Sequence, residues 1–103
     1  MQTIVTKFGG SSLADAAQFR KVAAIIREKP ERRFVVASAP GKRCSADTKV
    51  TDMLYSCYDA AAAHKDFLPL LAKIETRFAD IIKELDISFD IAAEIALIRA
   101  HLE

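Results

Sequence analysis

The sequence has 103 residues, a length that fits one small domain, and its 51% hydrophobic and 28% charged residues are typical of a globular protein, which excludes disorder and low complexity. Its 15 basic and 14 acidic residues leave a formal net charge of +1, so no global electrostatic field favours nucleic acid or an anionic membrane as a partner. No apolar stretch approaches the roughly 20 residues of a membrane-spanning helix, and no secretory signal is evident, so we expect a soluble, cytoplasmic protein.

The first half of the chain has the pattern of a βαβ unit. Residues 3–8 are rich in β-branched side chains and run into a Gly-Gly pair, which predicts a strand and a turn. A capping-box pattern, Ser12-x-x-Asp15, then predicts a helix that ends at Pro30. Its apolar stripe consists of Leu13, Ala16, Phe19, Val22, Ala23 and Ile26. The apolar run 33–38 predicts a second, well-buried strand, and one intervening helix favours parallel pairing of the two strands.

The second half of the chain is predicted to be helical. After Pro40-Gly41, residues 42–49 have neither the helical nor the strand period and indicate a polar loop. Three helices are then expected. The first is capped by Thr51-Asp52 and runs to about His64, and the second begins near Asp66, with Pro69 in its first turn. The last is capped by Ser88 and carries Ile91, Ile95, Ile98 and Leu102. The most regular apolar stripe belongs to the second of these helices and consists of Leu71, Ile74, Phe78, Ile81 and Leu85.

Two strands are few for an α/β sheet, which usually has several more. The last apolar stripe continues to Leu102 without a C-cap signal after it. We therefore expect the chain to be the first portion of a longer protein.

The segment Lys7-Phe8-Gly9-Gly10-Ser11-Ser12 carries the chemistry. Two glycines after a strand let the backbone approach a ligand closely, and the N–H groups at the start of a following helix favour an anion. Lys7 would neutralise charge on a transferring phosphoryl group, and the serines would supply further donors. The segment is neither a Walker A loop nor a G-x-G-x-x-G motif, and a simple tight turn is the alternative interpretation.

This segment, with Leu13, resembles the N-terminal KFGG[TS]S[VL] signature of the aspartate kinases, in the amino-acid kinase family. Two later stretches are also similar to that family, in the expected order. Residues 35–42 (VVASAPGK) resemble the exit of the second strand, and residues 49–54 (KVTDML) resemble the start of the next helix.

The resemblance implies transfer of the γ-phosphoryl group of ATP, with Mg²⁺, to the β-carboxylate of L-aspartate, giving 4-phospho-L-aspartate on the way to lysine, threonine and methionine. Lys7 would be the catalytic residue that stabilises the transferring phosphoryl. ATP phosphates would be bound by Lys7, Gly9, Gly10 and Ser11. L-Aspartate would be contacted by Ser38, Ala39 and Thr51. No protein metal ligand is implied in this chain.

The implied fold class is α/β: an N-terminal βαβ unit plus helices of a carbamate kinase-like, three-layer α/β/α amino-acid kinase domain, incomplete over residues 1–103 and without an ACT regulatory domain. The family's later R-G-E-type motif has no counterpart in this chain, and Glu94 lacks the preceding Arg-Gly, so it is assigned to a solvated helix face. We therefore expect this chain to be inactive alone and the full-length protein to be a homo-oligomer.

Two other functions stay open on the sequence alone. One is another member of the amino-acid kinase family, such as a glutamate, acetylglutamate or uridylate kinase. The other is a non-catalytic helical interaction module that retains only an anion-binding loop.

Two histidines, His64 and His101, are assigned to the surface, and the spacing of the two cysteines predicts reduced thiols rather than a zinc site. The basic residues of the 42–49 loop are either solvated or reach ATP phosphates.

Overall fold

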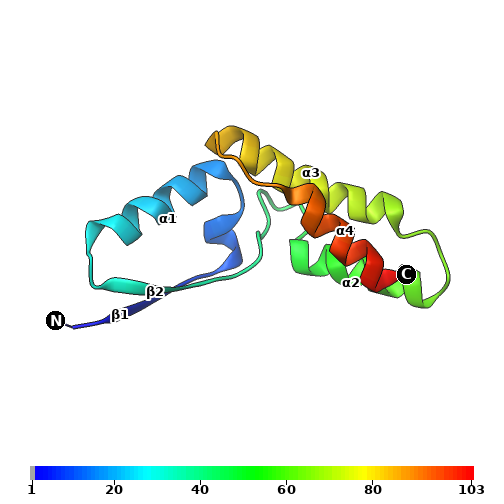
Figure 1. The fold of residues 1–103 in the computed structure, drawn as a ribbon, viewed down its shortest axis with the longest axis horizontal. Helices are drawn as coiled ribbons and strands as arrows, with labels where there is room; N and C mark the ends of the chain where they lie inside the picture. The colour runs from blue at the N-terminus through cyan, green and yellow to red at the C-terminus, as the bar shows by residue number, and fades with distance from the viewer. Residues whose placement is uncertain (1) are drawn as a thin grey trace. The chain divides into compact units, whose positions relative to one another are not determined.

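The computed structural model describes residues 2–103, and the chain divides into two compact units, Met1–Lys49 and Val50–Glu103. The first unit contains strand β1 (Ile4–Phe8), the short 3-10 helix η1 (Gly10–Leu13), helix α1 (Ala16–Glu28) and strand β2 (Arg32–Ala37) (Figure 1). The second unit contains the helices α2 (Val50–Ala62), α3 (Leu68–Leu85) and α4 (Ile91–Leu102). The α/β class predicted from the sequence is confirmed.

The first unit is a βαβ unit with parallel strands, as predicted. Val5 pairs with Phe34, and the register continues to Phe8 and Ala37, with an irregularity between Ile4 and Val5. Helix α1 lies along one face of this two-stranded sheet (Figure 1). The core on that face consists of Phe8, Leu13 and Val22, with Phe19 and Ile26 packed against it. The predicted apolar stripe of the helix therefore does face the sheet.

The prediction that the second strand is well buried was wrong. Five of the six residues of β2 are exposed, and Phe34 and Val36 retain 61% and 50% of their accessible surface. On the paired strand, Val5 retains 65%. Parallel strands are buried only where helices cover both faces of the sheet and further strands cover its edges, and this unit has one helix and two strands. An apolar strand sequence is thus necessary for burial but does not ensure it.

Two helix caps lie later in the chain than predicted. Asp15, rather than Ser12, is the N-cap of α1, and its carboxylate accepts a hydrogen bond from the N–H of Gln18 at 3.0 Å. Ser12 is instead part of η1, where its N–H donates to the Gly9 carbonyl at 3.1 Å. In α4 the N-cap is Asp90 rather than Ser88, and it accepts from the N–H of Ala93 at 3.2 Å. In both places the capping residue is the one directly before the first helical residue.

The second unit has the more regular core. Along α3, the predicted stripe is confirmed: Leu71, Ile74 and Ile81 are buried, and Ile74 retains only 1% of its accessible surface. Helices α2 and α4 both pack against α3 and contribute Cys57 and Ile95 to the buried residues. Helix α3 carries its proline in the first turn, as predicted, and ends at Asp86, whose left-handed backbone closes the helix.

Candidate functional site

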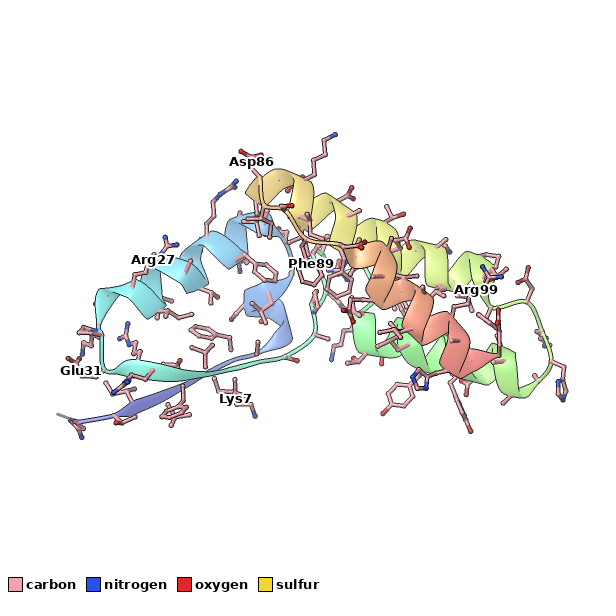
Figure 2. All side chains as sticks on the ribbon, in the orientation of Figure 1. Lys7, Arg27, Glu31, Asp86, Phe89 and Arg99 are labelled. Atoms are coloured by element: carbon pink, nitrogen blue, oxygen red, sulfur yellow. The ribbon has the colours of Figure 1, made fainter. Side chains whose placement is uncertain are left out.

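Lys7 lies near the end of β1, on the face of the sheet that α1 does not cover. Neighbouring residues of a strand point to opposite faces, so the burial of Phe8 under α1 directs Lys7 the other way. Figure 2 shows the Lys7 side chain extending from the strand away from α1. It is exposed, and Val36 is its register partner on β2. A charged side chain at this place is therefore available to a ligand at the strand end.

Directly after β1, residues 9–11 form the turn into η1, of which Gly10 and Ser11 are the first two residues; we call this segment the Gly9–Ser11 loop. Gly9 has extended backbone angles, and none of the described glycines has a positive φ, so the glycines are not needed in this loop for a left-handed conformation. Gly9 faces open space, since an added Cβ would meet nothing within 4 Å. Within the part of the chain that the structure describes, the N–H groups of Gly9, Gly10 and Ser11 donate to no backbone or side-chain acceptor. Three neighbouring N–H groups therefore remain available to an anion.

The residues that follow β2 lie against this loop. The N–H of Ser38 donates to the Phe8 carbonyl at 3.1 Å, which continues the strand pairing by one residue. Beyond it, an added Cβ at Gly10 would lie 3.1 Å from the Ala39 carbonyl oxygen. The N–H of Gly41 donates to the Gly10 carbonyl at 2.8 Å. The two strand exits are thus joined backbone to backbone at the carboxyl ends of the parallel strands, the usual place of ligands in α/β sheets.

The structure therefore brings six of the predicted site residues together in the first unit. They are Lys7, Gly9, Gly10, Ser11, Ser38 and Ala39. Gly41 joins these six through its hydrogen bond to Gly10, and it is not among the residues predicted from the sequence. The available signal was a glycine three residues after Ser38, at the exit of the second strand, but Pro-Gly pairs are common in turns and give no indication of a contact with another loop.

The seventh predicted residue, Thr51, belongs to the second unit. It is exposed in the first turn of α2 and lines a shallow groove of about 510 Å³ with Leu54, Tyr55 and Tyr58. The groove is largely apolar, and the two tyrosines retain 69% and 64% of their accessible surface. Thr51 supplies a hydroxyl group at one end of this surface.

The basic loop over residues 42–49 has an internal ion pair. The guanidinium of Arg43 donates from Nε to Oδ2 of Asp47 at 2.7 Å and from Nη2 to Oδ1 at 3.1 Å, and the Arg43 N–H donates to the same carboxylate. These hydrogen bonds from Arg43 hold the pKa of Asp47 well below its ordinary value. Arg43 is therefore engaged within the loop, while Lys42 and Lys49 are exposed.

The histidines and cysteines form no further centre in the described part of the chain. His64 and His101 are exposed, as predicted, and His64 has a left-handed backbone just after the end of α2. Both thiols are free; Cys44 is exposed, and burial raises the pKa of the Cys57 thiol. Residues 2–103 hold no group of three or more His, Cys, Asp or Glu side chains placed to bind a metal ion.

Over the described residues, no helix is both long and apolar enough to cross a lipid bilayer.

Comparison with known proteins finds similarity to two aspartate kinases. No family model matches the chain. It is 44% identical over 91 residues to aspartokinase 3 of Bacillus subtilis (strain 168), an alignment that covers 88% of this chain and 20% of that protein. It is also similar to the crystal structure of the aspartate kinase of Clostridium acetobutylicum, with a TM-score of 0.96 and 41% identity over 100% of this chain and 24% of that one. The chain thus spans less than a quarter of the length of either relative.

Proposed function

Because this chain belongs to the aspartate kinase family over the segment that it covers, we propose that it is part of an enzyme that transfers the γ-phosphoryl group of ATP to the β-carboxylate of L-aspartate. The product is 4-phospho-L-aspartate, and the step leads to lysine, threonine and methionine. The complete protein is a cytoplasmic homo-oligomer, and its catalytic domain has the three layers of an amino-acid kinase. Residues 1–103 form the N-terminal part of that domain.

The observation that carries this proposal is the junction of the two strand exits. Phosphoryl transfer needs little covalent help from a protein; it needs two anions held together and their charge neutralised. The unused N–H groups of Gly9, Gly10 and Ser11 lie beside the segment that begins with Ser38. One exit therefore supplies donors for the ATP phosphates, and the other supplies contacts for L-aspartate.

Each predicted residue has a role that fits its place. Lys7, charged and exposed at the end of β1, stabilises the transferring phosphoryl group, and Mg²⁺ arrives with ATP and neutralises the phosphate chain. Ser38, Ala39 and Thr51 contact the amino-acid substrate. No general base is required, because the acceptor carboxylate is already ionised at neutral pH. The family's remaining substrate contacts have no counterpart among the motifs of this chain, so the 103 residues bind ligand without turning it over.

The proposal is tested by titrating the ¹⁵N-labelled chain with ATP and Mg²⁺ and following the backbone amide resonances. We expect ATP to shift the resonances of Gly9, Gly10 and Ser11. Lys7→Ala is expected to weaken binding by about tenfold to a hundredfold, the range for loss of one charge-assisted hydrogen bond. Lys21→Ala is the matched control, because Lys21 is an exposed lysine on α1 and its loss changes the net charge equally.

Two results would contradict the proposal. One is equal ATP binding by wild type, Lys7→Ala and Lys21→Ala, which would remove Lys7 from the site. The other is equal affinity for ATP and inorganic phosphate, which would favour a non-catalytic module with an anion-binding loop. Weaker binding of ATP than of another nucleoside triphosphate would favour a different member of the amino-acid kinase family.

A further inference from the structure

Gly41 lies closer to the Gly9–Ser11 loop than a residue with a side chain could. Its N–H donates to the Gly10 carbonyl at 2.8 Å. A Cβ added at position 41 would lie 2.6 Å from the carbonyl carbon of Gly10 and 2.9 Å from the backbone nitrogen of Ser11. All of these neighbours are backbone atoms, which cannot rotate away as the end of a flexible side chain can. A glycine is therefore required at position 41 for space, since its φ is not positive.

We propose that Gly41 is a positioning residue, which holds the Gly9–Ser11 loop in the conformation that binds phosphate. A Cβ at position 41 would clash with the backbone nitrogen of Ser11, whose N–H is among the three available donors. Displacement of that nitrogen would change the direction of the donor without removing it. The inference rests on the proposed function for the identity of the ligand. The backbone contact of Gly41 with Gly10 and Ser11 exists without any ligand.

The contact lies outside the strand pairing and outside the apolar cluster. It lies beyond the last paired residues of the strands, Phe8 and Ala37, and beyond the additional hydrogen bond from Ser38 to Phe8. Gly41 is also not among the residues of the apolar cluster under α1. Loss of the contact is therefore expected to leave the strand pairing and the cluster in place while the loop shifts.

The chain offers a graded set of alanine substitutions for the test. Gly41→Ala creates the shortest approaches. Gly10→Ala acts on the same contact from the other side but more mildly, since its Cβ would lie 3.1 Å from the Ala39 oxygen and 3.2 Å from the Gly41 Cα. Gly9→Ala is the matched control for the unliganded loop, because its Cβ would meet nothing within 4 Å. All three variants keep the backbone N–H groups that would bind the anion.

The experiment uses the ¹⁵N-labelled full chain and inorganic tripolyphosphate as the probe. Before the probe is added, Gly41→Ala is expected to shift the amide resonances of residues 9–11 while those of α1 stay in place. The Gly41 amide resonance is expected to shift in Gly10→Ala and to stay in place in Gly9→Ala. On titration, tripolyphosphate binding is expected to weaken by about tenfold or more in Gly41→Ala, the size of a local overpacking strain, and by a smaller factor in Gly10→Ala.

The outcomes separate this inference from the proposed function. If the wild type binds tripolyphosphate and Gly41→Ala binds it equally, the positioning role is overturned and the proposed function stands. If the wild type does not bind the probe, the proposed function fails for this chain, and the resonances of residues 9–11 in unliganded Gly41→Ala still decide whether Gly41 holds the loop. If Gly41→Ala does not fold, Gly10→Ala decides alone, and an unshifted Gly41 amide resonance together with wild-type tripolyphosphate binding in that variant contradicts the inference.

Discussion

The two units differ in where their apolar residues lie. In the second unit, α2, α3 and α4 enclose a core of three isoleucines, one leucine, one valine and one cysteine, among them Ile74, which retains 1% of its accessible surface. In the first unit, one helix covers one face of two strands, and Val5, Phe34 and Val36 remain exposed on β1 and β2. The first unit nevertheless carries six of the seven predicted site residues. The predicted site residues belong mostly to the strand ends and loops of a sheet that one helix covers, and the more regular packing belongs to the unit that carries one of them.

Ile74→Ala is expected to have the largest effect on stability. The Ile74 side chain, on α3, is almost completely buried, so truncation leaves a cavity and lowers the free energy of unfolding by about 2–5 kcal/mol. Urea unfolding followed by far-ultraviolet circular dichroism measures this loss. Leu97→Ala, on the exposed part of α4, is the control and should change the free energy by less than about 0.5 kcal/mol. Equal losses in the two variants would show that the core of the second unit lies elsewhere.

The helix caps are expected to have intermediate effects in both units. Asp15→Ala and Asp90→Ala each remove an acceptor for an N–H in the first turn and should cost about 1 kcal/mol. Ser12→Ala and Ser88→Ala, the caps that the sequence predicted, should cost less than about 0.5 kcal/mol. The measurement is again urea unfolding. A larger loss for either serine than for its aspartate would reverse the assignment of that cap.

The Arg43–Asp47 pair should make the first unit sensitive to acid. The pKa of Asp47 is lowered in the folded chain, so the pair stabilises the fold above the unfolded pKa of about 3.9, and the contribution is lost as the pH falls below that value. Asp47→Asn should lower the free energy of unfolding by up to about 1 kcal/mol at pH 7, because Arg43 is partly exposed.

That difference between wild type and Asp47→Asn should be constant from about pH 5 to 8 and should shrink below about pH 4. Urea unfolding at several pH values measures it. Asp59→Asn, at an exposed aspartate on α2, is the control for the loss of one negative charge. A difference for Asp47→Asn that grew on acidification would contradict a lowered pKa of Asp47 in the folded chain.

Phe34→Thr should have the smallest effect. Its ring lies on the open face of the sheet, so its loss should change the free energy of unfolding by less than about 0.5 kcal/mol. Phe8→Leu, which alters a ring packed under α1, should cost about 1 kcal/mol. Urea unfolding of the two variants measures both changes in the free energy of unfolding. A loss for Phe34→Thr as large as that for Phe8→Leu would mean that the open face is covered in solution.

Much of the candidate site followed from the order of residues along the chain. A strand before Gly9 and a second strand before Ser38 already imply two neighbouring exits, because parallel strands end at the same edge. The order of residues did not predict how closely the backbones of the two exits approach each other. It depends on the two backbones meeting at Gly10 and Gly41, residues thirty-one positions apart, and no local pattern encodes such a distance.

The sequence alone determined the types of the elements, the parallel βαβ unit, the stripe of α3 and the family, because periodicity and short motifs are local properties of a chain. The tertiary structure decided which apolar residues are buried. The run 33–38 has the composition of a core strand, yet β2 is exposed, while Ile74 on an equally apolar stripe is enclosed. Burial depends on what packs against a residue, and that is a property of neighbours distant in sequence.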